Sequence, residues 1–256
     1  MNGNPLAAVI FDVDGTLVDS ERDGHRVAFN QAFAELGLPD RWDVDVYGRL
    51  LEVAGGRRRI DTWLAERGMP EPERRDLVPR LHERKTELFR QLVSDGGIDA
   101  RPGVDRLLDV LDAAGVTLAV ATTGTRAWVA PLLDLLFGAG RFAVVVTGDD
   151  VPDRKPDPSA YLLALRELDV DGHGVVAVED SQNGLLSANA AALTCVVVVN
   201  DYTADHDLAG AALVLDGFGD PERPAPVLAD PHGVATDGVL DAATLQRLIT
   251  AAGDHT

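Results

Sequence analysis

The chain contains 256 residues, enough for one large or two small domains with a substantial core. Acidic residues outnumber basic ones by 42 to 23, and the formal net charge of −19 disfavours non-specific binding to nucleic acid or to an anionic membrane. We find no signal-peptide pattern and no apolar run near the ~20 residues of a membrane span, and we expect a soluble, cytoplasmic protein. The single cysteine, Cys195, lies in an apolar run and is interpreted as a buried thiol.

Six short segments have the near-continuous apolar composition of parallel strands that are covered on both faces. Segments with helical spacing of apolar residues lie between them, and this alternation predicts a doubly wound α/β domain with a mostly parallel, Rossmann-like sheet. Residues 217–238, rich in Pro, Gly and Asp, predict a long loop or a local insertion. We predict strands at Ala7–Phe11, Thr117–Ala121, Ala143–Thr147, Val175–Val178, Thr194–Val199 and Ala212–Leu215, and helices at Val104–Ala114, Pro158–Leu168, Leu185–Ala192 and Asp241–Ala252.

Residues 19–93 break the alternation, because they contain helix-periodic segments and no convincing strand. We interpret this block as an α-helical cap inserted over the crevice at the end of the first strand, with residues 1–18 and 94–256 forming the catalytic core. A cap that opens and closes is most easily accommodated in a monomer, which is the state we expect. Its predicted helices are Arg26–Leu36, Tyr47–Leu51, Arg58–Arg67 and Asp76–Val93.

Asp12 and Asp14 follow the first predicted strand, and Gly15 allows the chain to turn away. Ligands of open α/β sheets bind at the carboxyl ends of strands, so both acids are placed where chemistry is usually done. Carboxylates two residues apart suit a hard cation such as Mg²⁺. The same residues are also common in a turn that simply ends a strand.

Polar residues follow three further strands in a similar way. Thr122 and Thr123 come after the second strand, where a hydroxyl and main-chain N–H groups can hold phosphoryl oxygens, although a Thr-rich strand end is equally ordinary. Lys155, set between Arg154 and a proline, is either a fixed ammonium or an ordinary exposed lysine. Glu179 and Asp180 follow the fourth strand, as part of a cation site or as a helix N-cap.

These motifs, in this order, resemble the haloacid dehalogenase superfamily of phosphotransferases, and the resemblance extends to about Asp216. Residues 19–30 and 42–48, and a glycine pair followed by basic residues, further resemble the CbbY-type subgroup. That subgroup contains sugar-bisphosphate phosphatases that remove the 1-phosphate of xylulose 1,5-bisphosphate, and β-phosphoglucomutase is a close relative. The basic run is Arg57-Arg58-Arg59 here, whereas the subgroup usually has Lys-Glu-Arg.

The resemblance implies Asp12 as the nucleophile and Asp14 as the general acid and base. It implies that Mg²⁺ is held by Asp12, the main-chain carbonyl of Asp14 and Asp180, with Glu179 completing the shell directly or through water. Thr122, the main chain of Thr123 and Lys155 would hold the transferring phosphoryl oxygens. The implied reaction is a phosphatase reaction through an aspartyl-phosphate, with a β-phosphoglucomutase-type mutase and a phosphoglycolate-type phosphatase as alternatives. A non-catalytic binding protein on the same fold would not need the full set of residues.

The resemblance also implies substrate contacts within residues 19–93. Arg59 and Lys85 match positions that bind a distal phosphate, whereas Arg57 remains open and Arg58 is interpreted as a solvated charge. Trp42 is interpreted as core. The sugar hydroxyls and the remaining substrate contacts are assigned to Glu21, His25, Tyr47, Gly55 and Gly56, although a lone histidine is as often structural.

Overall fold

The computed structural model describes residues 5–53, 55–235 and 237–253, and the chain divides into two compact units. The α/β unit comprises Met1–Asp19 and Asp99–Thr256, and the helical unit comprises Ser20–Ile98. The second boundary lies between Ile98 and Asp99 and not at the expected 93/94. Helix α4 (Glu71–Ser94) ends before it, but Ile98 is buried beside Gly24 of the helical unit, where a Cβ would lie 2.8 Å from its Cδ1.

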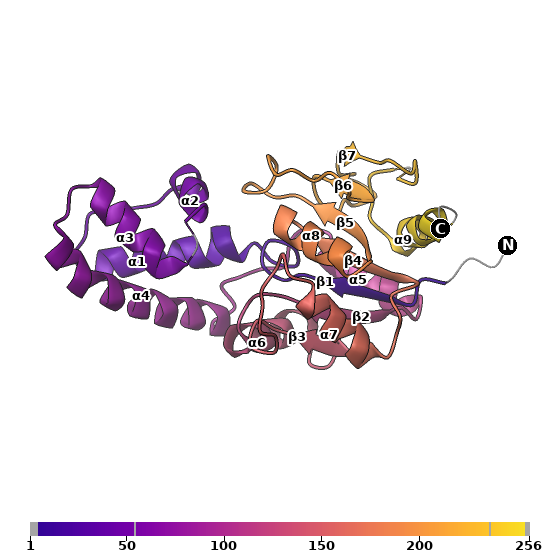
Figure 1. The fold of residues 1–256 in the computed structure, drawn as a ribbon, viewed down its shortest axis with the longest axis horizontal. Helices are drawn as coiled ribbons and strands as arrows, with labels where there is room; N and C mark the ends of the chain where they lie inside the picture. The colour runs from indigo at the N-terminus through magenta and orange to yellow at the C-terminus, as the bar shows by residue number, and fades with distance from the viewer. Residues whose placement is uncertain (1–4, 54, 236, 254–256) are drawn as a thin grey trace. The chain divides into compact units, whose positions relative to one another are not determined.

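The α/β unit is built on a seven-stranded sheet with the order β3-β2-β1-β4-β5-β6-β7 (Figure 1). Every neighbouring pair is parallel except β6 and β7, which are antiparallel, so the predicted mostly parallel α/β fold is confirmed. The strands are β1 (Ala8–Phe11), β2 (Thr117–Ala121), β3 (Val144–Val146), β4 (Val175–Glu179), β5 (Thr194–Val198), β6 (Leu213–Leu215) and β7 (Val227–Ala229).

The register of the three central strands determines where the polar residues meet. Phe11 at the end of β1 pairs with Val120 of β2 on one side and with Val178 of β4 on the other. Because the strands are parallel, the residues that follow each of them emerge at the same edge of the sheet. The sheet therefore brings the first acidic motif, the threonine pair and the second acidic motif together.

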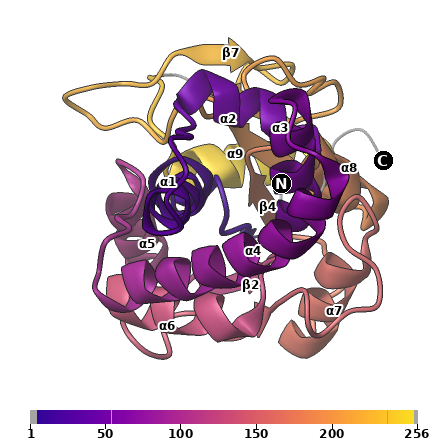
Figure 2. The same ribbon diagram turned by 90° about the vertical axis from the view of Figure 1, so that its left-hand side faces the viewer.

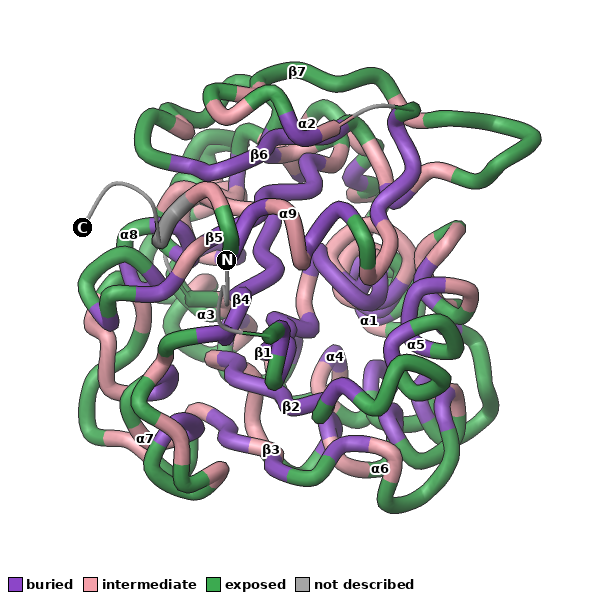
Figure 3. Tube along the Cα trace, turned by 90° about the vertical axis from the view of Figure 1, so that its right-hand side faces the viewer, coloured by how far each residue is buried: buried purple, intermediate pink, exposed green. Residues whose placement is uncertain are grey.

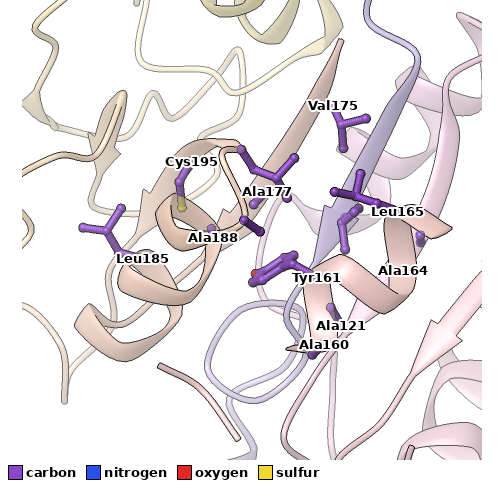
Figure 4. Close-up of a cluster of buried hydrophobic side chains, with 14 of the residues drawn as sticks. Ala121, Ala160, Tyr161, Ala164, Leu165, Val175, Ala177, Leu185, Ala188 and Cys195 are labelled. Atoms are coloured by element: carbon purple, nitrogen blue, oxygen red, sulfur yellow. The ribbon is translucent and has the colours of Figure 1, made fainter. Parts of the chain in front are cut away.

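Helices cover both faces of this sheet. Helices α7 (Ser159–Leu168) and α8 (Gln182–Ala190) pack on one face, and α5 (Val104–Ala113) and α9 (Ala242–Gly253) pack on the other. Figure 4 shows the buried cluster beneath α7 and α8, which includes Cys195, 1% exposed as expected for a core thiol. The central strands are buried along their length, whereas β7 is exposed (Figure 3).

The helical unit contains the π-helix η1 (Ser20–His25) and helices α1 (Arg26–Glu35), α2 (Val44–Leu51), α3 (Gly56–Glu66) and α4. Helix α4 packs against both α1 and α3 (Figure 2). Trp42 is fully buried, with ring centroids of Phe29 and Phe33 at 4.7 and 4.9 Å, so it forms the aromatic core of this unit.

Three elements lie outside the predicted set: η1, α6 and β7. Helix α6 (Arg126–Phe137) contains Pro131, which removes a main-chain donor and argues against a helix in the sequence. The segment 217–238 is not only a loop, because it supplies β7, a strand of three residues that is too short for a recognisable alternation. None of the helices in the described ranges combines the length and apolar character needed to cross a membrane.

Candidate active site

Lys155 joins the ends of three neighbouring strands. Its Nζ donates to Asp12 Oδ1 at 2.7 Å, to Glu179 Oε1 at 2.5 Å and to the carbonyl of Ala121 at 2.8 Å. These partners lie at the ends of β1, β4 and β2, and the Lys155 side chain is only 5% exposed. The predicted alternative of an ordinary exposed lysine is therefore wrong.

The loop before α7 keeps this lysine in place. The Lys155–Pro156 peptide bond is cis, and the chain then enters a turn around Asp157. Asp157 Oδ1 accepts from the main-chain N–H of Ser159 at 2.9 Å, and the hydroxyl of Ser187 on α8 donates to the Asp157 carbonyl at 2.7 Å. The main chain that follows Lys155 is thus held by hydrogen bonds from both α7 and α8.

Three buried carboxylates lie close together, and two of them, Asp12 and Glu179, bind the ammonium of Lys155. Asp12, Glu179 and Asp180 each offer an oxygen, and these oxygens lie within 4.8 Å of one another. Burial raises the pKa of Asp12 to about 7, against the opposing charge of Lys155. Burial, followed by the charges of Asp12, Glu179 and Asp14, raises the pKa of Asp180 well above its ordinary value. An excess of buried hard oxygen ligands fits a divalent cation such as Mg²⁺.

Lys155 remains charged despite its environment. Burial opposes its ionisation, but the charges of Asp12 and Glu179 outweigh that effect, and the pKa of Lys155 lies above its ordinary value. A permanent cation beside an acid of raised pKa is suited to binding a transferring anionic group.

Glu179 is buried, and residues of the neighbouring loop and helices fix its carboxylate. Oε1 accepts from Lys155 and, at 2.6 Å, from the hydroxyl of Tyr161 on α7. Burial and the charge of Glu179 raise the pKa of Tyr161 well above its ordinary value, so the phenol stays a donor. Oε2 lies against Gly184 of α8, where a Cβ would come within 1.8 Å of it. The Glu179 carboxylate is therefore positioned mainly to accept the hydrogen bond from Lys155.

Replacing Gly184 by alanine is expected to destabilise the protein by about 1–3 kcal/mol, because the new methyl group must displace the buried Glu179 carboxylate. At an ordinary helix position, Gly→Ala stabilises a protein by about 1 kcal/mol. A loss of stability in Gly184→Ala would therefore indicate the close contact with Glu179. Urea unfolding measures the change, and Asn183→Ala at the neighbouring exposed position of α8 is the control. A stabilised Gly184→Ala protein would contradict the close contact.

The threonine pair directly follows β2, the neighbour of β1 in the sheet. Thr122 is fully buried, its main-chain N–H donates to the Val146 carbonyl at 3.0 Å, and its Oγ1 accepts from the N–H of Gly124 at 3.1 Å. Gly148, after β3, approaches so closely that a Cβ would lie 2.4 Å from the Thr123 carbonyl oxygen. The Thr122 hydroxyl is thus held at the sheet edge, with its proton still available for donation.

Asp14 lies one turn beyond Asp12 and is half-buried, whereas Asp12 is 6% exposed. A hydrogen bond from the Asp14 main chain reaches the Asp12 carboxylate. The two acids therefore occupy different environments, one enclosed beside Lys155 and one nearer to solvent. Such a difference suits different roles for two carboxylates.

The helical unit holds a separate buried cluster of cations. Arg59 on α3 and Lys85 on α4 are each 8% exposed. Arg59 donates from Nη1 to the Tyr47 hydroxyl and from Nε to the Leu50 carbonyl, both at 2.9 Å. Lys85 Nζ lies 2.9 Å from Nδ1 of His25 and 4.8 Å from the centroid of the Phe29 ring.

Three further predicted residues, Tyr47, Glu21 and His25, belong to this cluster. The Tyr47 hydroxyl donates to the Glu21 carboxylate across a short contact. Burial and the charges of Lys85 and Arg59 lower the pKa of His25 well below its ordinary value, so His25 is neutral and can accept from Lys85. The cluster holds more positive than negative charge, as a binding site for an anion requires.

The basic run after the glycine pair divides into buried and exposed members. Arg59 is buried, whereas Arg57 and Arg58 are exposed. Gly55, with a φ of +88°, caps the start of α3, and its carbonyl accepts from the N–H of Arg59 at 3.0 Å. A Cβ on Gly56 would lie 3.0 Å from the His82 ring, so the pair shapes the helix start that carries Arg59.

Three residues in the α/β unit escaped the sequence analysis. Tyr161 binds Glu179, Asn200 binds Asp180, and Arg101 binds the carbonyl of Gly15. Asn200 directly follows β5, so the signal of a polar residue after a strand was present. Tyr161 and Arg101 gave no comparable signal, because their partners lie 18 and 86 residues away.

Comparison with known proteins gives a consistent result. The model of the haloacid dehalogenase-like hydrolase family matches residues 6–192. A CBBY-like protein of Arabidopsis thaliana is 43% identical over 223 residues, 84% of this chain and 70% of that protein. A mutant CbbY of Rhodobacter sphaeroides, solved with xylulose 1,5-bisphosphate, is 41% identical, with a TM-score of 0.68 over 83% of this chain and 94% of that one. A Thermotoga maritima protein assigned as a β-phosphoglucomutase is 29% identical, with a TM-score of 0.66 over 81% and 93%.

Proposed function

This chain belongs to the haloacid dehalogenase-like hydrolase family and is an enzyme, and on that basis we propose that it is a magnesium-dependent phosphatase of a small sugar bisphosphate. The observation that carries the proposal is Lys155, bound to Asp12 and Glu179 where three strands end. The proposed substrate is xylulose 1,5-bisphosphate, because a CbbY protein of 41% identity was solved with that molecule.

In the proposed reaction, an Asp12 carboxylate oxygen attacks phosphorus as the bond from phosphorus to the sugar oxygen breaks. Asp14 gives its proton to the leaving sugar oxygen, which releases the alcohol and leaves an aspartyl-phosphate. Asp14 then accepts a proton from water as that water attacks phosphorus. Inorganic phosphate leaves, and the Asp12 carboxylate is restored. Lys155, Thr122 and the main-chain N–H of Thr123 bind the phosphoryl oxygens throughout.

Asp12, Asp180 and the main-chain carbonyl of Asp14 would hold Mg²⁺. When bound, the cation offsets the repulsion between an anionic nucleophile and an anionic phosphoryl group. Since Glu179 Oε1 already binds Lys155 and Tyr161, we assign Glu179 to the cation shell through water.

Magnesium is expected to stabilise the protein more strongly as pH rises. The folded-state pKa of Asp12 is about 7 against an ordinary 3.8, so without metal the folded protein retains a proton and its stability falls between these values as pH increases. Mg²⁺ requires the ionised carboxylate, so its affinity grows through about pH 7 and then levels off. Thermal unfolding with and without Mg²⁺ at about pH 6 and about pH 8.5, at constant ionic strength, measures this. Equal stabilisation at both pH values would contradict it.

The cation cluster of the helical unit is assigned to the second phosphate of the substrate. Arg59 and Lys85 would bind its oxygens, and His25, by accepting from Lys85, would fix the direction of that ammonium. Glu21 and Tyr47 would contact the sugar hydroxyls, and Gly55 and Gly56 would provide the main chain beside them.

Arg59→Met is expected to lower kcat/KM for a sugar bisphosphate by about 10–150-fold, the value of one charge-assisted hydrogen bond of ~1.5–3 kcal/mol. The loss should be much smaller for a monophosphate, because that substrate lacks the group that Arg59 binds. Arg58→Met, at the adjacent exposed position, is the matched control. Because Arg59 is buried, Arg59→Lys and thermal unfolding separate binding from folding. Equal losses for both substrates would argue against the assignment.

A phosphate-release assay tests the function as a whole. The protein is incubated with Mg²⁺ and xylulose 1,5-bisphosphate, ribulose 1,5-bisphosphate, phosphoglycolate or glucose 1-phosphate. Release of inorganic phosphate, fastest from xylulose 1,5-bisphosphate, is the expected result. A clear preference for phosphoglycolate would overturn the distal-phosphate role, since its far end is a carboxylate on a short chain.

A mutase is the second candidate, favoured by the similarity to the protein assigned as a β-phosphoglucomutase. A mutase returns the phosphoryl group to a different hydroxyl of the sugar. The same assay separates the two, because a mutase forms an isomeric sugar phosphate and no equivalent amount of inorganic phosphate.

A further inference from the structure

Asn200 joins the acidic centre directly after β5. Its Nδ2 donates to Asp180 Oδ2 at 2.8 Å and to the Gly15 carbonyl at 3.2 Å, and its Oδ1 accepts from the main-chain N–H of Tyr202 at 2.9 Å. A reversed amide would place its oxygen against a carboxylate and a carbonyl, so only this orientation suits the surroundings. Asn200 therefore presents its donor to Asp180.

Gly15 encloses the same carboxylate oxygen from another side. A Cβ on Gly15 would lie 2.3 Å from Asp180 Oδ2 and 2.9 Å from Asn200 Nδ2, and the φ of +90° also disfavours a side chain there. Arg101 fixes this main chain, because Nη1 donates to the Gly15 carbonyl at 2.5 Å and Nη2 to the Val199 carbonyl at 2.6 Å. Asp180 Oδ2 is thus confined between a fixed turn and a fixed amide.

We propose that Asn200 is a positioning residue that restricts Asp180 to binding a cation through one oxygen, and that it thereby favours Mg²⁺ over Ca²⁺. The proposal rests on the magnesium site of the proposed function. With Oδ2 engaged by Asn200, Oδ1 is the oxygen that Asp180 offers to a cation.

Mg²⁺ and Ca²⁺ differ in coordination geometry, so limiting Asp180 to one oxygen affects their binding differently. Mg²⁺ requires near-octahedral geometry with single oxygens at short distance, whereas Ca²⁺ accepts about six to eight oxygens, including both oxygens of one carboxylate. A carboxylate released from Asn200 could turn and bind through two oxygens. That change favours the larger cation and disturbs the octahedral shell of the smaller one.

The test is calorimetric titration of the full-length protein with Mg²⁺ alone and with Ca²⁺ alone, without substrate. In Asn200→Ala, we expect the Mg²⁺ Kd to rise about 10-fold or more, the usual effect of losing a partner of a metal ligand. The Ca²⁺ Kd should stay the same or fall, so the ratio of the two Kd values shifts at least about 10-fold. A purely structural role would weaken both cations alike.

Two further variants make the result decisive. Asn200→Asp keeps the shape and the acceptor for Tyr202 but removes the donor, and its Kd ratio should shift in the same direction even if Asn200→Ala folds poorly. Asn189→Ala removes an exposed amide that donates to the Gly210 carbonyl at 3.4 Å, and its ratio should not change. Unchanged ratios in both Asn200 variants overturn this inference alone. Failure of the wild-type protein to bind either cation overturns the magnesium site and this inference together.

Discussion

Replacing Asp12 by asparagine is expected to lower kcat by at least about 10⁴-fold while the protein remains folded. The amide is a far weaker nucleophile than the carboxylate, so the first phosphoryl transfer is lost. Its carbonyl oxygen can still accept from Lys155, which in the wild-type protein donates to Asp12 Oδ1 at 2.7 Å. The substitution also removes one of three mutually repelling buried carboxylates. The free energy of unfolding should therefore stay close to its wild-type value.

Phosphate release and thermal unfolding measured on the same preparation test this expectation. Asp153→Asn, at an exposed position of a loop in the same unit, is the control and should retain full activity. Asp14→Asn provides a second comparison, because it removes both the acid of the first step and the base of the second, and it should lower kcat as well. Mass spectrometry of the intact protein would detect any aspartyl-phosphate that forms and is not hydrolysed. Near-normal activity of both Asp12→Asn and Asp12→Ala would remove the central claim.

Lys155→Met is expected to lose both activity and stability. Removing the ammonium leaves Asp12 and Glu179 buried without their shared partner, and breaking a buried ion pair in this way costs about 3–5 kcal/mol. For a chain of this size that corresponds to a fall in Tm of roughly 6–20 °C. The loss of one cation that binds the phosphoryl oxygens lowers kcat by about 10²–10³-fold. Arg154→Met, at the exposed neighbouring position, should change neither quantity.

The pH dependence of the stability lost in Lys155→Met shows whether Lys155 stabilises the protein through its charge or through its packing. Without Lys155, the pKa of Asp12 rises above its wild-type value of about 7, because the opposing charge is gone. The folded variant then retains a proton to higher pH than the unfolded chain, so its stability falls as pH rises through that range. The difference from wild type should be small near about pH 5 and largest above about pH 7. A difference that does not vary with pH would mean that the lysine contributes by packing alone.

The sequence predicted the frame of the α/β unit because its strands carry a strong local signal. The segment before Asp12 and the valine run around Cys195 are apolar on both faces, as buried parallel strands require. The polar residues that follow such strands could be placed together, since parallel strands end at one edge of the sheet. Helix α6 and strand β7 lacked such signals, because Pro131 opposes a helix and β7 has only three residues.

The detailed contacts of the centre were beyond sequence reasoning for a different reason. That Glu179 binds Lys155 rather than presenting both oxygens to a cation depends on Tyr161 and Gly184, which approach from two separate helices. Each of these residues has an ordinary role in its own helix, and only the packing of α7 and α8 on the sheet brings them to the same carboxylate. A pattern along the chain contains no information on such distances.

Strand β7 has a consequence for the behaviour of the protein in concentrated solution. An outermost strand presents unpaired main-chain groups to which another chain can add, and Val227 and Leu228 are exposed and apolar here. Pro224 and Pro226 precede the strand and Pro231 follows it, and none of them has an N–H to offer. The strand is also antiparallel to β6 and paired with an irregular register. The prolines around β7 therefore limit the pairing of another chain with this edge of the sheet.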